Sequence, residues 1–500
     1  MILYFLLSLL VGFIVYLTWR TYTYWEDKGI PYDKPHLPFG SLESLAKQER
    51  SFGMAIYDLY EKYQTRFVGI YLCFRPAILI RDAQLCKDIL TKDFASFHDR
   101  GVYVDEKNDP FSANLFTCEG QNWKSLRNKL TPSFSSGKLK LMFPIILETS
   151  KKMKTYLLDN LQDKNHIFDI KDINNRYAID IVASVIFGVE VDSFKDPDNM
   201  FRQATININS KSIIGNIRAA SSFLCPGLAK LFTTLRIPDK MTNFIKKMVK
   251  DVVEYREKNN YVRKDLMQML IQLRNSGTIN ADDNNWAVQN VPENLKSMSL
   301  DKISGQGFIF FVAGFDTTSS LASFCIYELA QNPDIMQEVV KEIDEVLKNY
   351  NGEITYEAIS DMKFLEKCVM ETLRKFPFPL LNRMCTVDYK VPESSFTIKK
   401  GTPIIISIMG LHRDPEYFPD PLKFDPNRDL NTPAYMPFGD GPRNCIAYRL
   451  GKVSAKVSIV TMLSQFKIEC IEKKEIEIDN HSVPLVPKGG VNVRFSRKGS

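Results

Sequence analysis

The sequence predicts a mainly α-helical fold with small β-sheets, organised as one large domain behind an N-terminal membrane anchor. Apolar residues recur at helical spacing from about residue 120 to 275, for instance in YAIDIVASVIFGV (177–189). Between residue 30 and the C-terminus there is no Gly/Ser linker, low-complexity tract or internal repeat. The chain has 500 residues, 44% of them hydrophobic and 12% aromatic, so it can bury one large core.

The N-terminal segment predicts a membrane span. Residues 2–18, ILYFLLSLLVGFIVYLT, carry no charge, and a cleaved signal peptide would need a basic start and a small-residue cleavage site. We therefore expect residues 1–19 to be a transmembrane signal anchor. Basic side chains follow the span and none precedes it, which predicts a cytosolic location for the remaining chain. Residues 20–42 contain Pro31, Pro35 and Pro38 and predict a stiff linker, with the main domain over residues 43–500.

Further local signals predict individual elements along the main domain. The runs FVGIY (67–71) and PAILI (76–80) predict a hairpin around Phe74-Arg75. Ser299 is a suitable N-cap for a long helix that should end at Asn332-Pro333, roughly 50 Å away at 1.5 Å per residue. Helices should follow at about 333–349, 362–376 and 446–466, with short strands in 386–408 and a terminal hairpin near 488–490.

Composition excludes several classes of site. The net charge is +6, and its 65 basic and 59 acidic residues are mixed along the chain, as on a solvated surface. No Arg/Lys run is interleaved with aromatics, so we expect no nucleic-acid binding. The nine cysteines are widely spaced without a CxxC pair, and no HExxH pair occurs. This spacing favours scattered thiols in a reducing compartment over a disulfide framework or a zinc site.

The most informative segment is PFGDGPRNCIAYRLGKVSAKVSIVTML (437–463). Gly439 and Gly441 lie just before Cys445, and an apolar-periodic helix begins just after it. Glycines allow backbone amides to turn toward a nearby atom, and a helix N-terminus adds free N–H groups and positive potential. With the charge of Arg443, these features favour an anionic sulfur over an ordinary buried cysteine.

Residues 438–447, FGDGPRNCIA, resemble the haem-binding loop of the cytochromes P450. The resemblance implies that Cys445 is the thiolate ligand of the haem iron and that Phe438 and Arg443 bind the cofactor. The family pattern has Gly where this chain has Ala447, whose methyl group should lie near the porphyrin. The similarity extends over nearly the whole chain and implies a cytochrome P450-like fold for the haem-thiolate catalytic domain, residues 43–500.

Two further motifs match the family in order and spacing. Glu371, Arg374 and Arg428 correspond to a buried polar triad that supports the cysteine loop, although a solvated pair is the ordinary alternative. The segment AGFDTT (313–318) resembles the oxygen-activation motif, in which an acid and the following Thr relay protons. Asp316 and Thr317 are therefore the candidate catalytic residues, and a polar kink with a satisfied carboxylate is the alternative.

Three further side chains match positions that bind the haem propionates in the family. Trp123 and Arg127 lie in WKSLR (123–127), and Arg383 follows the triad helix. An arginine–carboxylate contact is chemically suitable for this role. For each of the two arginines, a position on the surface without a cofactor contact is the alternative.

The closest resemblance is to microsomal enzymes of insects, in particular the family-six group linked to xenobiotics. It implies a monooxygenase of the endoplasmic reticulum membrane, with its catalytic domain on the cytoplasmic side, that oxidises a lipophilic substrate. Phe111, Phe116, Phe315 and Phe378 are candidate pocket walls. The implied electron donor is an NADPH-dependent flavoprotein reductase, with a small haem electron carrier as an additional partner. A basic face for such a partner should comprise Lys124, Arg127, Lys129, Arg449 and Lys452.

Two other functions remain open from the sequence. A haem-thiolate isomerase or dehydratase acting on peroxides needs no proton relay, so Asp316-Thr317 argues against it. A haem sensor would need neither the basic face nor an anchor. The chain has no GxGxxG fingerprint after a strand, so it should not bind NADPH itself.

Overall fold

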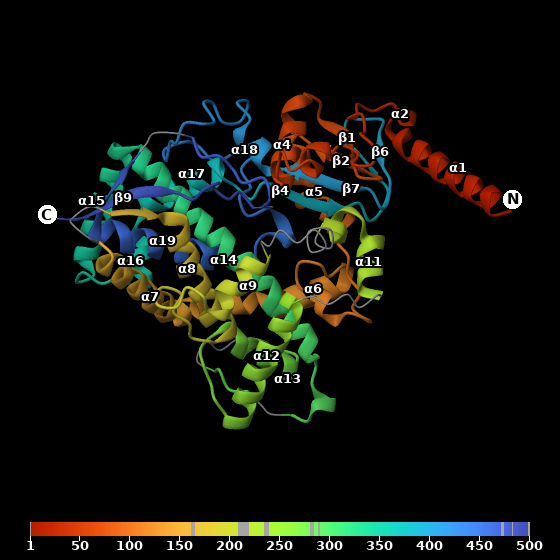
Figure 1. Ribbon diagram of the computed structural model, residues 1–500. Helices are drawn as coiled ribbons and strands as arrows, with labels where there is room; N and C mark the ends of the chain where they lie inside the picture. Colours follow the sequence, from red (N-terminus) through yellow and green to blue (C-terminus); the bar gives the residue numbers. More distant parts are fainter. Residues whose placement is uncertain are drawn as a thin grey trace.

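A computed structural model describes residues 2–161, 166–208, 220–234, 240–280, 285–288, 291–471, 475–482 and 484–498. Helices dominate the described chain; the sheet with β1, β2, β4 and β7 lies near α1, and β9 lies at the opposite end beside α15 (Figure 1). The helices of the first half are α1 (Ile2–Tyr22), α2 (Tyr24–Asp27), α3 (Glu43–Ala46), α4 (Phe52–Lys62), α5 (Ala83–Leu90), α6 (Gly120–Leu130), α7 (Ser136–Asp159), α8 (Ile170–Val182), α9 (Met200–Ile208) and α11 (Pro226–Thr234). Those of the second half are α12 (Lys240–Asn259), α13 (Leu266–Ser276), α14 (Leu300–Gln331), α15 (Pro333–Asn349), α16 (Tyr356–Asp361), α17 (Lys363–Lys375), α18 (Ile408–Arg413) and α19 (Tyr448–Gln465).

Helix α14 is the central element of the helical part. The Ser299 side chain accepts a hydrogen bond from the Lys302 amide and caps its first turn, while Pro333 begins the next helix. Helices α8, α12 and α19 pack against it. Among the described helices only α14 is long and apolar enough to cross a membrane, and 72% of its apolar window is buried inside the protein. The predicted long helix is therefore confirmed as the core of the fold.

The strands form three sheets. The largest has the order β1-β2-β7-β4, built from β1 (Phe67–Leu72), β2 (Arg75–Ile80), β7 (Pro403–Ser407) and β4 (Leu380–Met384). β1 and β2 are the predicted hairpin, with Phe67 paired to Ile80. The second sheet has the order β3-β9-β8, from β3 (His166–Asp169), β9 (Asn492–Arg497) and β8 (Phe466–Cys470), and β5 (Tyr389–Lys390) pairs with β6 (Thr397–Ile398).

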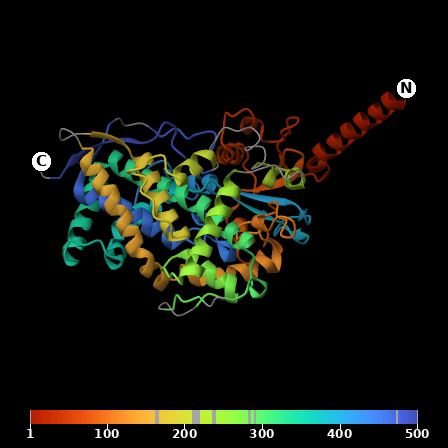
Figure 2. The same cartoon turned by 60° about the horizontal axis from the view of Figure 1, so that its bottom comes forward.

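The N-terminal segments differ in how they contact the rest of the protein. Helix α1 projects away from the body in both views (Figures 1 and 2), and its described apolar side chains such as Phe13 and Val15 are exposed. The residues after it do not stand free as a spacer. The Trp25 ring is fully buried and its Nε1 donates to the Ile70 carbonyl oxygen over 3.0 Å. The proline-rich stretch therefore lies against the β1–β2 hairpin, because that hairpin needs a hydrophobic cover.

Candidate active site

The loop before α19 holds the Cys445 side chain. Gly439 and Gly441 have φ values of +72° and +67°, and a Cβ atom at Gly441 would overlap the Leu90 carbonyl group. Both conditions favour glycine, because left-handed backbone and close approach each disfavour a side chain. The Cys445 amide donates to the Phe438 carbonyl oxygen over 2.9 Å, which closes the loop on itself. This loop conformation places the sulfur just ahead of the first turn of α19.

The Cys445 sulfur is accessible, although protein surrounds it on nearly every side. Burial raises the pKa of this thiol, whereas the Ala447 N–H that donates to the sulfur and the charges of Arg127 and Arg100 oppose the rise. The predicted charge partner, Arg443, is replaced in this role by Arg127 and Arg100. A metal cation would complete the stabilisation, because a coordinating thiol loses its proton outright.

Four arginines from four separate segments gather near this sulfur: Arg100, Arg127 of α6, Arg383 of β4, and Arg443 of the 3-10 turn Gly441–Arg443. Burial, together with the nearby Arg443 charge, lowers the pKa of Arg383 to about 9. Burial lowers the pKa of Arg443 to about 10. In the described chain no ion pair neutralises Arg100, Arg127 or Arg383, and Arg443 has only Asp99 at 3.7 Å. Several buried N–H groups lack an acceptor, namely Nε of Arg100, Arg383 and Arg443 and Nη2 of Arg383.

This arrangement fits an iron porphyrin, since buried cations with free donors require anions and a porphyrin carries two carboxylates. The residues predicted for this role have defined positions. The Arg443 guanidinium lies 4.2 Å from the centre of the Trp123 ring and its Nη2 donates to the Cys118 carbonyl oxygen over 2.6 Å. Arg127 donates to both the carbonyl and side-chain oxygens of Asn444, over 2.9 and 2.8 Å.

Arg100 was not predicted from the sequence. It lies in an irregular stretch, FHDRGVY (97–103), where no periodicity or motif distinguishes it from a surface arginine. In the structure its guanidinium stacks on the Phe116 ring at 4.2 Å and Nη1 contacts the Asn382 side-chain oxygen at 3.3 Å. Arg383, in turn, donates to the Asn382 carbonyl oxygen over 2.8 Å. Asn382 therefore positions both arginines.

Helix α14 presents two small side chains toward the accessible interior. Ala313 and Thr317, one turn apart, are exposed although their helix forms the core, and Thr317 Oγ1 donates to the Ala313 carbonyl oxygen over 2.6 Å. A Cβ atom at Gly451 of α19 would lie 3.9 Å from Oγ1 of the neighbouring Thr318. The cysteine helix and the predicted oxygen motif therefore meet in space.

Asp316 points in a different direction from Thr317. Its carboxylate is buried and accepts a hydrogen bond from Lys171 Nζ of α8 over 2.7 Å. The same ammonium donates to the hydroxyls of Ser319 and Ser320 over 2.7 and 2.9 Å. Burial lowers the pKa of Lys171, while the Asp316 charge counteracts that effect. Consecutive helical residues point about 100° apart, so the acid is buried against α8 while the neighbouring hydroxyl is exposed.

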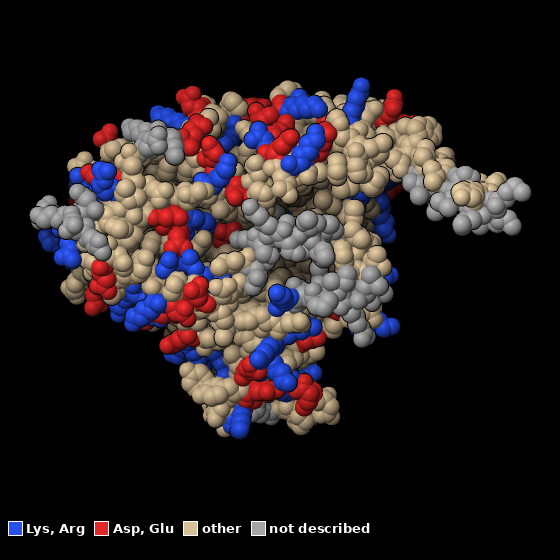
Figure 3. Space-filling model, viewed as in Figure 1, with Lys and Arg blue, Asp and Glu red and all other residues tan. Residues whose placement is uncertain are grey.

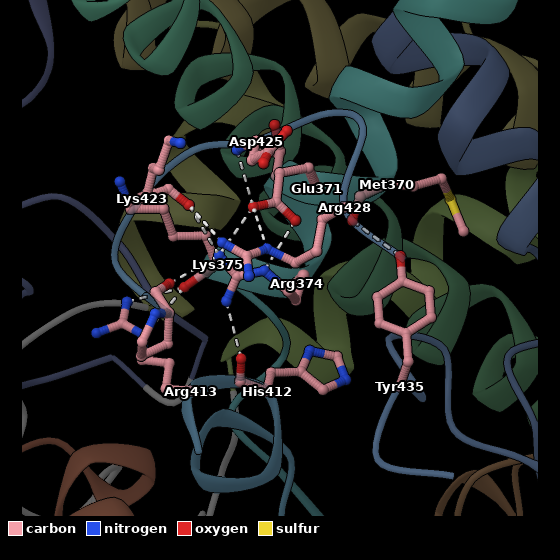
Figure 4. A network of polar contacts seen from close by, with 12 residues as sticks. Met370, Glu371, Arg374, Lys375, His412, Arg413, Lys423, Asp425, Arg428 and Tyr435 are labelled. Atoms are coloured by element: carbon pink, nitrogen blue, oxygen red, sulfur yellow. Dashed lines mark hydrogen bonds and ion pairs between the residues drawn. The ribbon is translucent and has the colours of Figure 1, made fainter. Parts of the chain in front are cut away.

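The predicted triad is present as a buried network (Figure 4). Arg374 donates to both oxygens of Glu371 over 2.8 and 2.9 Å, and Arg428 Nε reaches Glu371 at 3.4 Å. Arg374 also donates to the His412 and Pro421 carbonyl oxygens over 2.8 and 2.7 Å. The network thus joins α17 to α18 and to the chain that leads into the cysteine loop.

The four candidate pocket phenylalanines divide into two groups. Phe111 and Phe315 are buried in the core, where Phe111 stacks against Phe308 and Phe315 against Phe311. Neighbouring side chains therefore cover most of the surface of both rings. Phe116 and Phe378 are 38% and 40% exposed and remain available to a ligand.

Comparison with known proteins gives a consistent result. The family described as "Cytochrome P450" matches residues 30–493. The chain is 50% identical over 508 residues to "Probable cytochrome P450 6d5" of Drosophila melanogaster, covering 99% of each protein. It is 50% identical to "Cytochrome P450 6d3" of Musca domestica over 100% of this chain and 99% of that protein. It is also 37% identical to "Cytochrome P450 6k1" of Blattella germanica, over 98% of this chain and 96% of the other.

Proposed function

The chain belongs to the cytochrome P450 family, and from this premise we propose that it is a membrane-anchored monooxygenase for lipophilic substrates. In this proposal it inserts one oxygen atom of O2 into the substrate, with electrons from NADPH through a partner flavoprotein reductase. The observation that carries it is the accessible Cys445 thiol beside four buried or half-buried arginines, three of which have no ion pair in the described part of the chain. Family members bind haem through a cysteine thiolate, and we assign that role here to Cys445.

Haem, when bound, supplies the redox centre at which dioxygen is activated. The residues of this chain hold and tune it. Arg100, Arg127, Arg383 and Arg443 would hold the propionates, with Trp123 supporting Arg443. Phe438, whose carbonyl accepts from the Cys445 amide, would orient the sulfur. The Ala447 N–H that donates to the sulfur stabilises its anionic form.

We assign proton delivery to Thr317, whose hydroxyl faces the accessible interior beside Ala313. We also assign Asp316 to proton delivery, although its carboxylate forms an ion pair with Lys171. Its ion pair with Lys171 must exchange partners before the carboxylate can pass a proton along the helix. General acid catalysis by one positioned group accelerates a reaction by about 10²–10⁴.

We propose that the surface that binds the substrate, beside Ala313 of α14, is apolar. Phe116 and Phe378 offer exposed aromatic surface, and Ala313 leaves room above α14. A pocket with this lining selects by shape and hydrophobicity, which favours a lipophilic xenobiotic, endogenous lipid or hormone.

We also propose where the protein resides. Residues 1–19 would be the anchor, 20–42 a linker that packs against the β1–β2 hairpin, and 43–500 the catalytic domain, at the cytoplasmic side of the endoplasmic reticulum membrane. The exposed apolar residues of α1 support the anchor. Lys and Arg are interspersed with Asp and Glu on the face seen in Figure 3. Of the predicted basic face, Lys124 and Arg449 are exposed, whereas Lys452 pairs with Glu366 at 2.5 Å.

Turnover by the purified full-length protein tests this proposal. A panel of lipophilic compounds should yield hydroxylated products only with NADPH, dioxygen and the reductase. Product formation without NADPH would favour the isomerase or dehydratase, and haem binding without any turnover would favour the sensor.

A variant of the proton donor tests the mechanism. Thr317→Ala should continue to oxidise NADPH but form more peroxide and less product. Thr317→Ser keeps the hydroxyl and should restore coupling. Normal coupling in Thr317→Ala would show that protons arrive by another route.

A further inference from the structure

Helix α14 holds the segment 110–118, which carries Phe116, against the protein core. This segment begins with a 3-10 turn, Pro110–Ser112, that packs against α14. A Cβ atom at Gly305 of α14 would lie 2.5 Å from the Phe111 carbonyl oxygen, which is closer than real side chains come. The backbone of the segment therefore approaches α14 this closely only because residue 305 has no side chain.

The next residue of α14, Gln306, supplies the polar part of this contact. Gln306 is fully buried; its Nε2 donates to the Ala113 carbonyl oxygen over 3.1 Å, and its Oε1 accepts from the Leu115 amide over 2.9 Å. A carboxamide both donates and accepts, so it can pair with two backbone groups of one segment at once. Because a buried backbone group without a partner is costly, loss of this side-chain amide should release the segment from α14.

Contacts within the segment carry this fixed position on to Phe116. The Asn114 side-chain oxygen accepts from the amides of Phe116 and Thr117 over 3.0 and 3.2 Å, which closes a turn. Arg443 Nη1 donates to the Phe116 carbonyl oxygen over 3.3 Å, and the Arg100 guanidinium lies 4.2 Å from the centre of the Phe116 ring. The ring therefore has a defined place, from which its exposed part can contact a ligand.

Gln306 itself lies away from the reacting site. It precedes Ala313 by about two helical turns, roughly 10 Å along the axis of α14. Gln306 is fully buried, whereas Ala313 and Thr317 are exposed. Any effect of Gln306 on a ligand must therefore pass through the segment that it holds.

We propose that Gln306 is a positioning residue for substrate selectivity: it fixes the backbone from Ala113 to Leu115 and, through it, the Phe116 ring beside the substrate. This inference rests on the proposed function, which assigns Phe116 to the substrate surface. Gln306 takes no part in haem binding or proton delivery. Its loss weakens the binding of ligands large enough to reach Phe116 and leaves the binding of small ligands unchanged.

Two nitrogen ligands of the haem iron, imidazole and the larger 4-phenylimidazole, test the proposal on full-length, haem-loaded protein. The Kd of each is measured from the shift of the haem absorption band. Gln306→Leu keeps a similar volume and removes both hydrogen bonds. It should raise the Kd of 4-phenylimidazole by about three- to tenfold, as for the loss of one aromatic contact, and that of imidazole by less than about twofold. Neither probe is turned over, so the result is independent of monooxygenase activity.

A double-mutant cycle tests whether Gln306 acts through Phe116. Phe116→Ala should show the same selective loss, and adding Gln306→Leu to it should cause no further loss. Gln84→Leu, the same change at an exposed position of α5, should bind both probes like the unmodified protein. Equal losses for the two probes in Gln306→Leu, as expected of a purely structural role, or additive losses in the double variant, would overturn the proposal.

Gly305→Ala tests the same contact with the Gln306 amide intact. Its methyl group would meet the Phe111 carbonyl oxygen and displace the segment, whereas alanine favours the helix itself. This variant should therefore keep its haem and reproduce the selective loss for 4-phenylimidazole. Unchanged binding of 4-phenylimidazole in Gly305→Ala would show that the position of the segment does not control the pocket.

Discussion

The buried histidine of the triad network makes a measurable prediction about stability and pH. His412 is fully buried; its Nε2 accepts a hydrogen bond from the Met436 amide over 3.0 Å, and its ring stacks on Tyr435 at 5.2 Å. Burial, reinforced by the nearby Arg374 charge, lowers the pKa of His412 from 6.5 to about 3. The folded protein therefore keeps this ring neutral at a pH where the unfolded chain binds a proton.

The sign and the size of the effect follow from proton linkage. Below pH 6.5 the unfolded state binds one more proton than the folded state, so stability falls as the pH decreases toward 3. One pH unit below 6.5, this histidine should cost about 1.4 kcal/mol of unfolding free energy. His412→Gln keeps an acceptor for the Met436 amide and has no proton to bind, so its stability should fall less between pH 7.5 and 5.5.

Urea unfolding of the full-length protein at pH 7.5, 6.5 and 5.5 measures this difference. His36, whose side chain is 61% exposed, provides the matched control. His36→Gln should lose stability with pH much as the unmodified protein does, because it leaves the buried His412 ring in place. If the His412→Gln curve is also parallel, the buried neutral histidine does not set the acid sensitivity of the fold.

Three further outcomes are expected. Cys445→Ser should lose the thiolate-type carbon monoxide difference spectrum, whereas Cys470→Ser should keep it; retention of that spectrum in Cys445→Ser would refute the assigned ligand. Glu371→Gln leaves the Arg374 cation buried without its carboxylate and should lower the unfolding free energy by about 3–5 kcal/mol. Glu357→Gln, which removes an exposed ion pair with Lys140, should change it by less than about 1 kcal/mol, and similar losses in the two variants would place the triad in solvent. Removal of residues 2–19 should shift protein from the membrane pellet to the supernatant while haem binding persists, and a soluble but haem-free product would contradict an independent catalytic domain.

Local signals were sufficient for the secondary structure around the site. The runs FVGIY and PAILI on either side of Phe74-Arg75 predicted β1 and β2, and Ser299 and Pro333 delimit α14 as expected. These predictions succeeded because hairpins, caps and proline stops depend on residues close in sequence. The family-six resemblance is confirmed by relatives that are 50% identical over the full length.

Packing decided the features that periodicity does not encode. Apolar spacing marks a buried face without stating what covers it, and only the structure shows that Phe111 packs against Phe308 and Phe315 against Phe311. Trp25 lies in the segment predicted to be a stiff linker, and the structure shows that its ring is buried against the β1–β2 hairpin.

The sequence by itself determined the fold class, the cysteine loop and the order of the motifs, because each is a property of neighbouring residues. Only the tertiary structure decided which charges meet. It gathers Arg100 with three predicted arginines and turns Asp316 toward Lys171 and away from the side on which Thr317 is exposed. Such contacts depend on how separate elements cross in space, and charge interactions act through distance rather than through position in the chain.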